Sequence, residues 1–154
     1  MRKSVGSVLL LCFVLEAYGW AGLGSHDTMY VGGTVASLTE KSEGKSNLAD
    51  DAFVFERKSS KLSIPYKQIN SLEYGQKAGR RVGLAVAVSP LLLFSKKRRH
   101  YLTINYLDEN QKQQAAVFEL GKDIIRPTLG TLEIKTGHKI DFQDDEARKS
   151  AGAK

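Results

Sequence analysis

Cysteine is almost absent from this sequence. The single cysteine among the 154 residues, Cys12, lies in an apolar run near the N-terminus, so no disulfide can form within the chain and no cysteine cluster can hold a metal. The three histidines, His26, His100 and His138, are not spaced as metal ligands. Neither a G-x-G-x-x-G nor a Walker phosphate-binding pattern occurs. We therefore expect no metal, no cofactor and no catalytic activity.

Long apolar runs are also scarce, and the first of them predicts export. Basic residues precede the apolar run Val8–Leu15, and Gly19 and Ala21 supply small side chains at the −3 and −1 positions of a cleavage site. This pattern predicts that residues 1–21 are a secretory signal peptide. An uncleaved anchor is the alternative, which the run disfavours because a membrane-spanning helix needs about 20 apolar residues. We expect a periplasmic or extracellular protein.

The length after such cleavage suits one domain. Cleavage after Ala21 would leave 133 of the 154 residues and would lower the formal net charge from +6 to +5, because Arg2, Lys3 and Glu16 are removed. A chain of that length can bury roughly two-thirds of its unfolded surface, so a hydrophobic core can hold it without disulfides. We place a single domain at residues 29–142 and a flexible charged tail without an apolar face at residues 143–154.

Alternation of apolar and polar residues dominates the domain and predicts a mainly β fold. A polar stretch at residues 40–50 is interpreted as a loop, and Gly32-Gly33 as a bulge or bend. Pro65 is expected to end a strand or to place it at a sheet edge. The expected strands cover residues 29–38, the hairpin 53–64, residues 69–74, and a second hairpin that pairs residues 101–106 with 116–120.

The periodicity changes near the C-terminus. Ile125, Leu129 and Leu132 recur at the spacing of one helix face, which predicts one amphipathic helix. Asp123 can cap its start, and Gly137 can adopt the left-handed conformation that ends a helix. After this helix, a short apolar contact is expected at residues 140–142. The predicted order is thus about six or seven strands followed by one helix.

This order resembles the pleckstrin-homology-like (PH-like) superfold. The segment Leu62–Glu73 contains Ile64-Pro65-Tyr66 and then Ile69, which is similar to the I-P-Y-x-x-I run of GRAM-type and bacterial members. The resemblance covers residues 29–137 and implies a curved antiparallel sheet, or partly open barrel, capped by the C-terminal helix. By analogy it also implies a binding or scaffolding module. The sequence departs from the family in a long apolar insert.

That insert lies between two basic clusters. Residues 82–94 carry no charge, whereas basic residues precede and follow them. As a helix, these residues would be about 20 Å long, which is too short for a hydrocarbon core of about 30 Å. Ser89-Pro90 would also kink such a helix. We expect a hairpin or bent loop with both basic flanks on one side.

Three interpretations of the insert remain open. In the first, residues 82–88 form a buried strand and residues 91–94 pack beneath it. In the second, the loop enters one leaflet of the membrane while its cations contact anionic headgroups. In the third, the loop is an exposed patch that binds an envelope protein. Nucleic acid is not expected, because no aromatic residues are interleaved with the basic run. The candidate membrane or partner surface comprises Arg80, Arg81, Leu91, Leu92, Leu93, Phe94, Lys96, Lys97, Arg98, Arg99 and His100.

The sequence thus predicts an exported, non-enzymatic module that is peripheral to the envelope membrane or attached to an envelope protein. A different function remains possible for the same fold class: a soluble small-molecule binder that uses the interior of a curved sheet.

Overall fold

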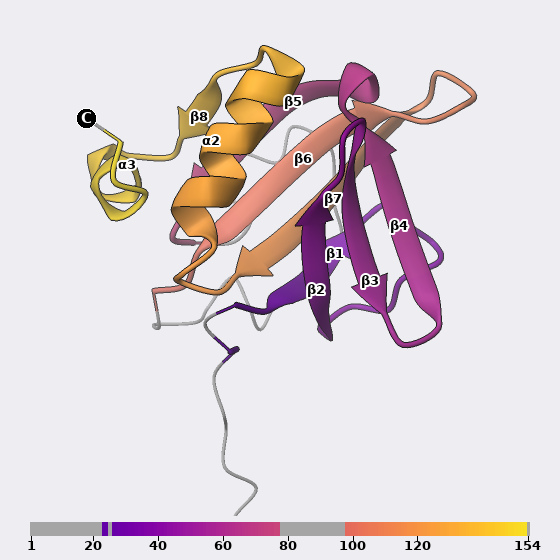
Figure 1. Ribbon diagram of the computed structural model, residues 1–154, viewed down its shortest axis with the longest axis horizontal. Helices are drawn as coiled ribbons and strands as arrows, with labels where there is room; N and C mark the ends of the chain where they lie inside the picture. The colour runs from indigo at the N-terminus through magenta and orange to yellow at the C-terminus, as the bar shows by residue number, and fades with distance from the viewer. Residues whose placement is uncertain (1–22, 25, 78–97, 154) are drawn as a thin grey trace, which may run out of the picture.

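Eight strands form one sheet in the computed structural model, which describes residues 23–24, 26–77 and 98–153 (Figure 1). Two α-helices and a short 3₁₀ helix, η1 (Tyr66–Gln68), complete the fold in this part of the chain. The prediction of a mainly β domain is confirmed, with one strand more than the largest number expected. The strands are β1 (Thr28–Gly33), β2 (Ser42–Leu48), β3 (Ala52–Arg57), β4 (Ser60–Pro65), β5 (Ile69–Gly75), β6 (Tyr101–Leu107), β7 (Gln113–Leu120) and β8 (Ile140–Phe142).

The sheet is mixed and, within the described residues, open. Its strand order is β4-β3-β2-β1-β7-β6-β5-β8, so β4 and β8 are its two edges. All neighbouring strands pair antiparallel except β5 and β8, which pair parallel. Figure 1 shows β2, β3 and β4 running at a steep angle to β5 and β6. A sheet with two separate edges does not support a β-barrel.

The interpretation of residues 40–50 as a loop is wrong, because β2 occupies most of them. This strand has few apolar side chains, but it lies between β1 and β3, whose strands supply its hydrogen-bond partners. Gly44 is needed there, since a Cβ atom at this position would lie 2.9 Å from the Phe55 ring and 2.3 Å from the Glu56 carbonyl oxygen. The alternation rule misses such a strand because its inner face carries small residues.

The expected bulge in the first strand is confirmed, although β1 is shorter than predicted. The pairing of β1 with β7 shifts register between Tyr30 and Gly32, and Gly33 has a φ of 150°. Only glycine adopts such a conformation readily. The chain then turns at Thr34, whose backbone N–H donates to the Ala115 carbonyl at 2.9 Å.

The main core lies between the inner face of the sheet and helix α2 (Ile125–Thr136) (Figure 1). Ile125, Leu129 and Leu132 are buried in it, which confirms the predicted helix face. Gly137 ends the helix with a φ of 73°, also as predicted. The predicted cap is wrong: α2 has no side-chain cap, and Asp123 instead lies 3.4 Å from His26.

The opposite face of the central strands is buried as well. Met29 and Val31 of β1, Val117 of β7 and Tyr101 of β6 form a second apolar cluster, against which Leu23 packs. Each of these four side chains is at most 8% exposed. The central strands are therefore apolar on both faces, which explains why their sequences depart from strict alternation.

The C-terminal segment differs from the flexible tail that the sequence predicts. Asp144 accepts a hydrogen bond from the Ala147 N–H at 2.7 Å and caps helix α3 (Asp145–Ser150). Ala147 and Ala151 are buried in the main core. The expectation that this segment has no apolar face is wrong, because two alanines suffice when a helix packs closely.

Candidate functional site

Most of the predicted surface lies outside the described residues. This applies to Arg80, Arg81, Lys96, Lys97 and residues 91–94, and also to residues 82–88, which one interpretation makes a strand. The structure describes the remaining three residues of the predicted surface, Arg98, Arg99 and His100.

The two ends of the intervening segment lie together. Gly75, the last residue of β5, pairs directly with Tyr101, the first residue of β6. Beyond this pair, the Arg99 N–H donates to the Gln76 carbonyl at 3.4 Å. β5 therefore ends, and β6 begins, at the same end of this strand pair.

Arg99 forms a largely buried ion pair. Its Nη1 donates to both carboxylate oxygens of Glu119, at 2.7 and 3.0 Å. The Glu119 side chain is 7% exposed and that of Arg99 is 28% exposed. The hydrogen bond to Glu119 raises the pKa of Arg99. Glu119 on the sheet balances the charge of Arg99. Arg99 is therefore not the free surface cation that the sequence predicts.

Tyr101 lies beside this ion pair, directly opposite Glu119 on the neighbouring strand. Burial, followed by the charge of Glu119, raises the pKa of Tyr101 to about 12, so the phenol is neutral at physiological pH. Its buried hydroxyl has no hydrogen-bond partner in the described part of the chain.

His100 is held by contacts with the sheet, above all with Tyr74 of β5. Its Nδ1 lies 2.6 Å from the buried Tyr74 hydroxyl, which is also 3.2 Å from the Ser150 hydroxyl. Burial lowers the pKa of His100, which favours the neutral ring. The Tyr74 hydroxyl thus contacts both His100 and α3, and a neutral His100 ring adds no positive charge to the surface.

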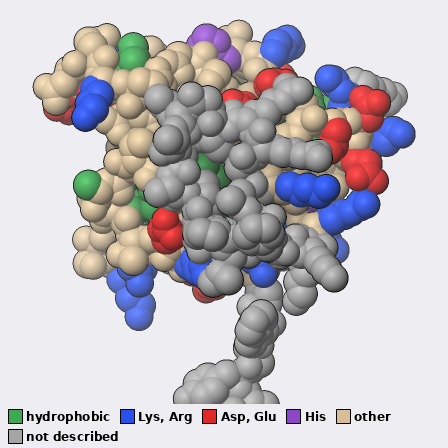
Figure 2. Space-filling view, turned by 180° about the vertical axis from the view of Figure 1, so that it is seen from behind, with side chains coloured by type: hydrophobic (Ala, Val, Ile, Leu, Met, Phe, Trp, Pro, Cys, Tyr) green, Lys and Arg blue, Asp and Glu red, His purple; other side chains and the backbone are tan. Residues whose placement is uncertain are grey.

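Arg98 is the one exposed cation among the three described residues of the predicted surface. Its guanidinium lies 3.0 Å from Glu146 of α3, and both side chains are more than 60% exposed. Figure 2 shows side chains of both signs close together at the end of the molecule that carries α3. Arg98 is thus accessible from solvent.

Other chemistry is sparse in the part of the chain that the structure describes. No group of three or more histidine, cysteine, aspartate or glutamate side chains there could hold a metal ion. Among the same residues, no helix is long and apolar enough to cross a membrane.

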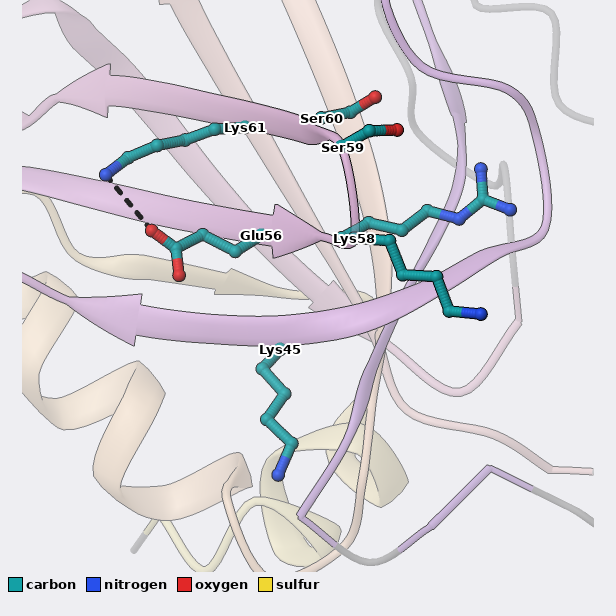
Figure 3. A pocket seen from close by; sticks show the side chains of 7 residues that line it. Lys45, Glu56, Lys58, Ser59, Ser60 and Lys61 are labelled. Atoms are coloured by element: carbon teal, nitrogen blue, oxygen red, sulfur yellow. Dashed lines mark ion pairs between the residues drawn. The ribbon is translucent and has the colours of Figure 1, made fainter.

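The structure reveals a second charged surface that the sequence does not predict. The β3–β4 hairpin and the neighbouring β2 line an open pocket of about 480 Å³ (Figure 3). Lys45, Glu56 and Lys61 lie side by side across β2, β3 and β4. Glu56 and Lys61 form an ion pair of 3.0 Å (Figure 3). We call this the hairpin surface; its lining residues are Lys45, Glu56, Arg57, Lys58, Ser59, Ser60 and Lys61.

The comparisons add no family to these observations. No known protein family matches this chain, and no curated protein matches it either.

Proposed function

We propose that this chain is an exported, non-enzymatic binding module that attaches peripherally to the envelope membrane through its basic-flanked apolar segment. The observation that supports the proposal most is the meeting of β5 and β6 at the Gly75–Tyr101 pair. Because the segment starts and ends at one place, Lys77 and the accessible Arg98 belong to the same end of the hairpin. Cations gathered in this way can contact one anionic surface together.

We also propose that the fold is PH-like. Its support is the order of seven strands paired antiparallel, from β1 to β7, followed by a helix that packs on the core. The parallel strand β8 and helix α3 are additions to what the resemblance implies. The small-molecule alternative has less support, because the rings of Phe53, Phe55 and Phe118 pack at centroid distances of 5.0 to 5.4 Å inside the sheet.

The proposal predicts salt-dependent binding to anionic vesicles. A variant with Arg80, Arg81, Lys96 and Lys97 replaced by glutamine removes four cations and leaves the Arg99–Glu119 pair intact. Co-sedimentation with phosphatidylglycerol vesicles should weaken by up to about 4 kcal/mol at low salt, since each cation near such a surface contributes about 1 kcal/mol. Thermal unfolding should barely change, because isolated surface charges contribute little to stability.

A matched variant separates a local effect from an effect of net charge. Replacing Lys41, Lys45, Arg57 and Lys58 by glutamine also removes four cations, but from the other end of the chain's β sheet. This control should bind vesicles nearly as well as the unchanged protein. Equal losses in both variants would mean that only the total charge matters, and the proposal would fail.

A further inference from the structure

The outer edge of β4 is open in the described part of the chain. β4 is the last strand of the sheet and pairs only with β3 there. The opposite edge strand, β8, has three residues, and α3 follows it closely in the chain. An unpaired edge presents backbone N–H and C=O groups on which another extended chain can form hydrogen bonds.

The hairpin geometry identifies the outward-facing groups. Arg57 pairs with Ser60 across a two-residue turn, and in such a hairpin the pairs alternate between hydrogen-bonded and non-hydrogen-bonded. Lys61 and Ser63 therefore occupy non-hydrogen-bonded positions, and their backbone N–H and C=O groups point to the outer edge. Pro65 also occupies a non-hydrogen-bonded position, so the N–H group that proline lacks is not needed for pairing with β3.

The side chains next to this edge define a charge pattern. Along the row Lys45, Glu56 and Lys61 the charge alternates in sign across three strands. On the other face of β4, Leu62 is partly buried against the main core. A strand added beside β4 would continue this row with an acidic side chain opposite Lys61 and an apolar one opposite Leu62.

We infer that the outer edge of β4 binds an extended segment of a partner protein as an added strand, with an acidic residue opposite Lys61. Glu56, which pairs with Lys61 on the neighbouring strand, favours a partner with discrete charges over a uniformly anionic membrane. A second copy of the chain is disfavoured, because antiparallel β4 strands would bring their Lys61 side chains near one another. The inference is independent of the membrane proposal.

The lysine also gives selectivity. A charged side chain on an edge strand blocks indiscriminate pairing with apolar strands. Lys61 is 63% exposed, so it can turn from Glu56 toward a carboxylate on an added strand at small cost. The same side chain would repel a basic segment.

The test uses the full-length protein and two fluorescein-labelled peptides of nine residues, one alternating glutamate with valine and one alternating lysine with valine. Fluorescence anisotropy should show saturable binding of the acidic peptide only. Ser63→Pro removes one outward N–H and should weaken this binding at least about tenfold, whereas Ser63→Ala keeps the N–H and should leave it unchanged. Lys61→Glu should reverse the preference between the two peptides.

Several results would overturn the inference. They are absence of saturable acidic-peptide binding, a Lys61→Glu variant with unchanged preference, and equal binding by the Ser63→Pro and Ser63→Ala variants. Circular dichroism checks that Ser63→Pro folds, and Lys61→Glu, a surface substitution, provides the test if it does not. Size-exclusion chromatography that shows a dimer broken by Ser63→Pro would assign the edge to a second copy and would also contradict the inference.

Discussion

Arg99→Gln should lower the free energy of unfolding by about 3 kcal/mol, because it leaves a buried carboxylate without its cation. Glu119 is 7% exposed, and both its oxygens accept from the Arg99 guanidinium. Glutamine is shorter and neutral, so it can neither reach as the guanidinium does nor balance the charge. Urea-induced unfolding, monitored by circular dichroism, measures this change in the free energy of unfolding.

Two controls test the cause of that loss. Arg98→Gln also removes an ion-paired arginine, but its pair with Glu146 is exposed, so the change should cost no more than about 0.5 kcal/mol. Adding Glu119→Gln to Arg99→Gln removes the stranded charge and should restore part of the stability. If Arg98→Gln and Arg99→Gln lowered the free energy of unfolding by equally small amounts, the Arg99–Glu119 pair would not stabilise the fold.

Leu132→Ala should destabilise the protein by about 2–5 kcal/mol, as removal of a buried leucine side chain usually does. Leu132 is fully buried between α2 and the sheet. The matched control is Ile134→Ala, two residues further along the same helix, where the side chain is 83% exposed. This control should change stability by no more than about 0.5 kcal/mol. Equal effects at both positions would mean that α2 does not dock as described.

The parts of the fold that the sequence predicts are those with a strong local period. The β3–β4 hairpin alternates clearly, β6 and β7 carry an apolar residue at every second position of their inner face, and the buried residues of α2 recur at helical spacing. Gly137 is predictable because few residues other than glycine end a helix in the left-handed conformation. Such features depend on neighbours in the chain and need no knowledge of distant contacts.

The wrong predictions involve elements that other parts of the chain stabilise. β2 is polar, and its neighbours β1 and β3 supply its pairing. Helix α3 docks through Ala147 and Ala151, which are too small to give a hydrophobic period. Asp123 has a good capping residue type, yet α2 begins without a side-chain cap.

At the candidate site, too, the sequence predicts local features and misses contacts between residues that are distant in the chain. The sequence locates the basic residues that flank the insert, but it cannot reveal that Arg99, which precedes β6, meets Glu119 of β7, because the two lie 20 positions apart in the chain. The contacts among Tyr74, His100 and Ser150 join residues up to 76 positions apart. The hairpin surface could be suspected only from a correct assignment of β2, since Lys45 reaches it from that strand.

The most direct test of the membrane proposal is Leu92→Asp, measured by co-sedimentation with anionic vesicles and by thermal unfolding. The proposal predicts a variant that unfolds at nearly the same temperature as the unchanged protein and no longer sediments with the vesicles, because a charge in the apolar segment prevents its entry into the leaflet. Two results together would contradict the proposal. The Leu92→Asp variant would fail to fold, and the variant with Arg80, Arg81, Lys96 and Lys97 replaced by glutamine would bind vesicles as well as the unchanged protein. That outcome would mean that the charge was placed in the core of the domain and that the apolar segment is structural.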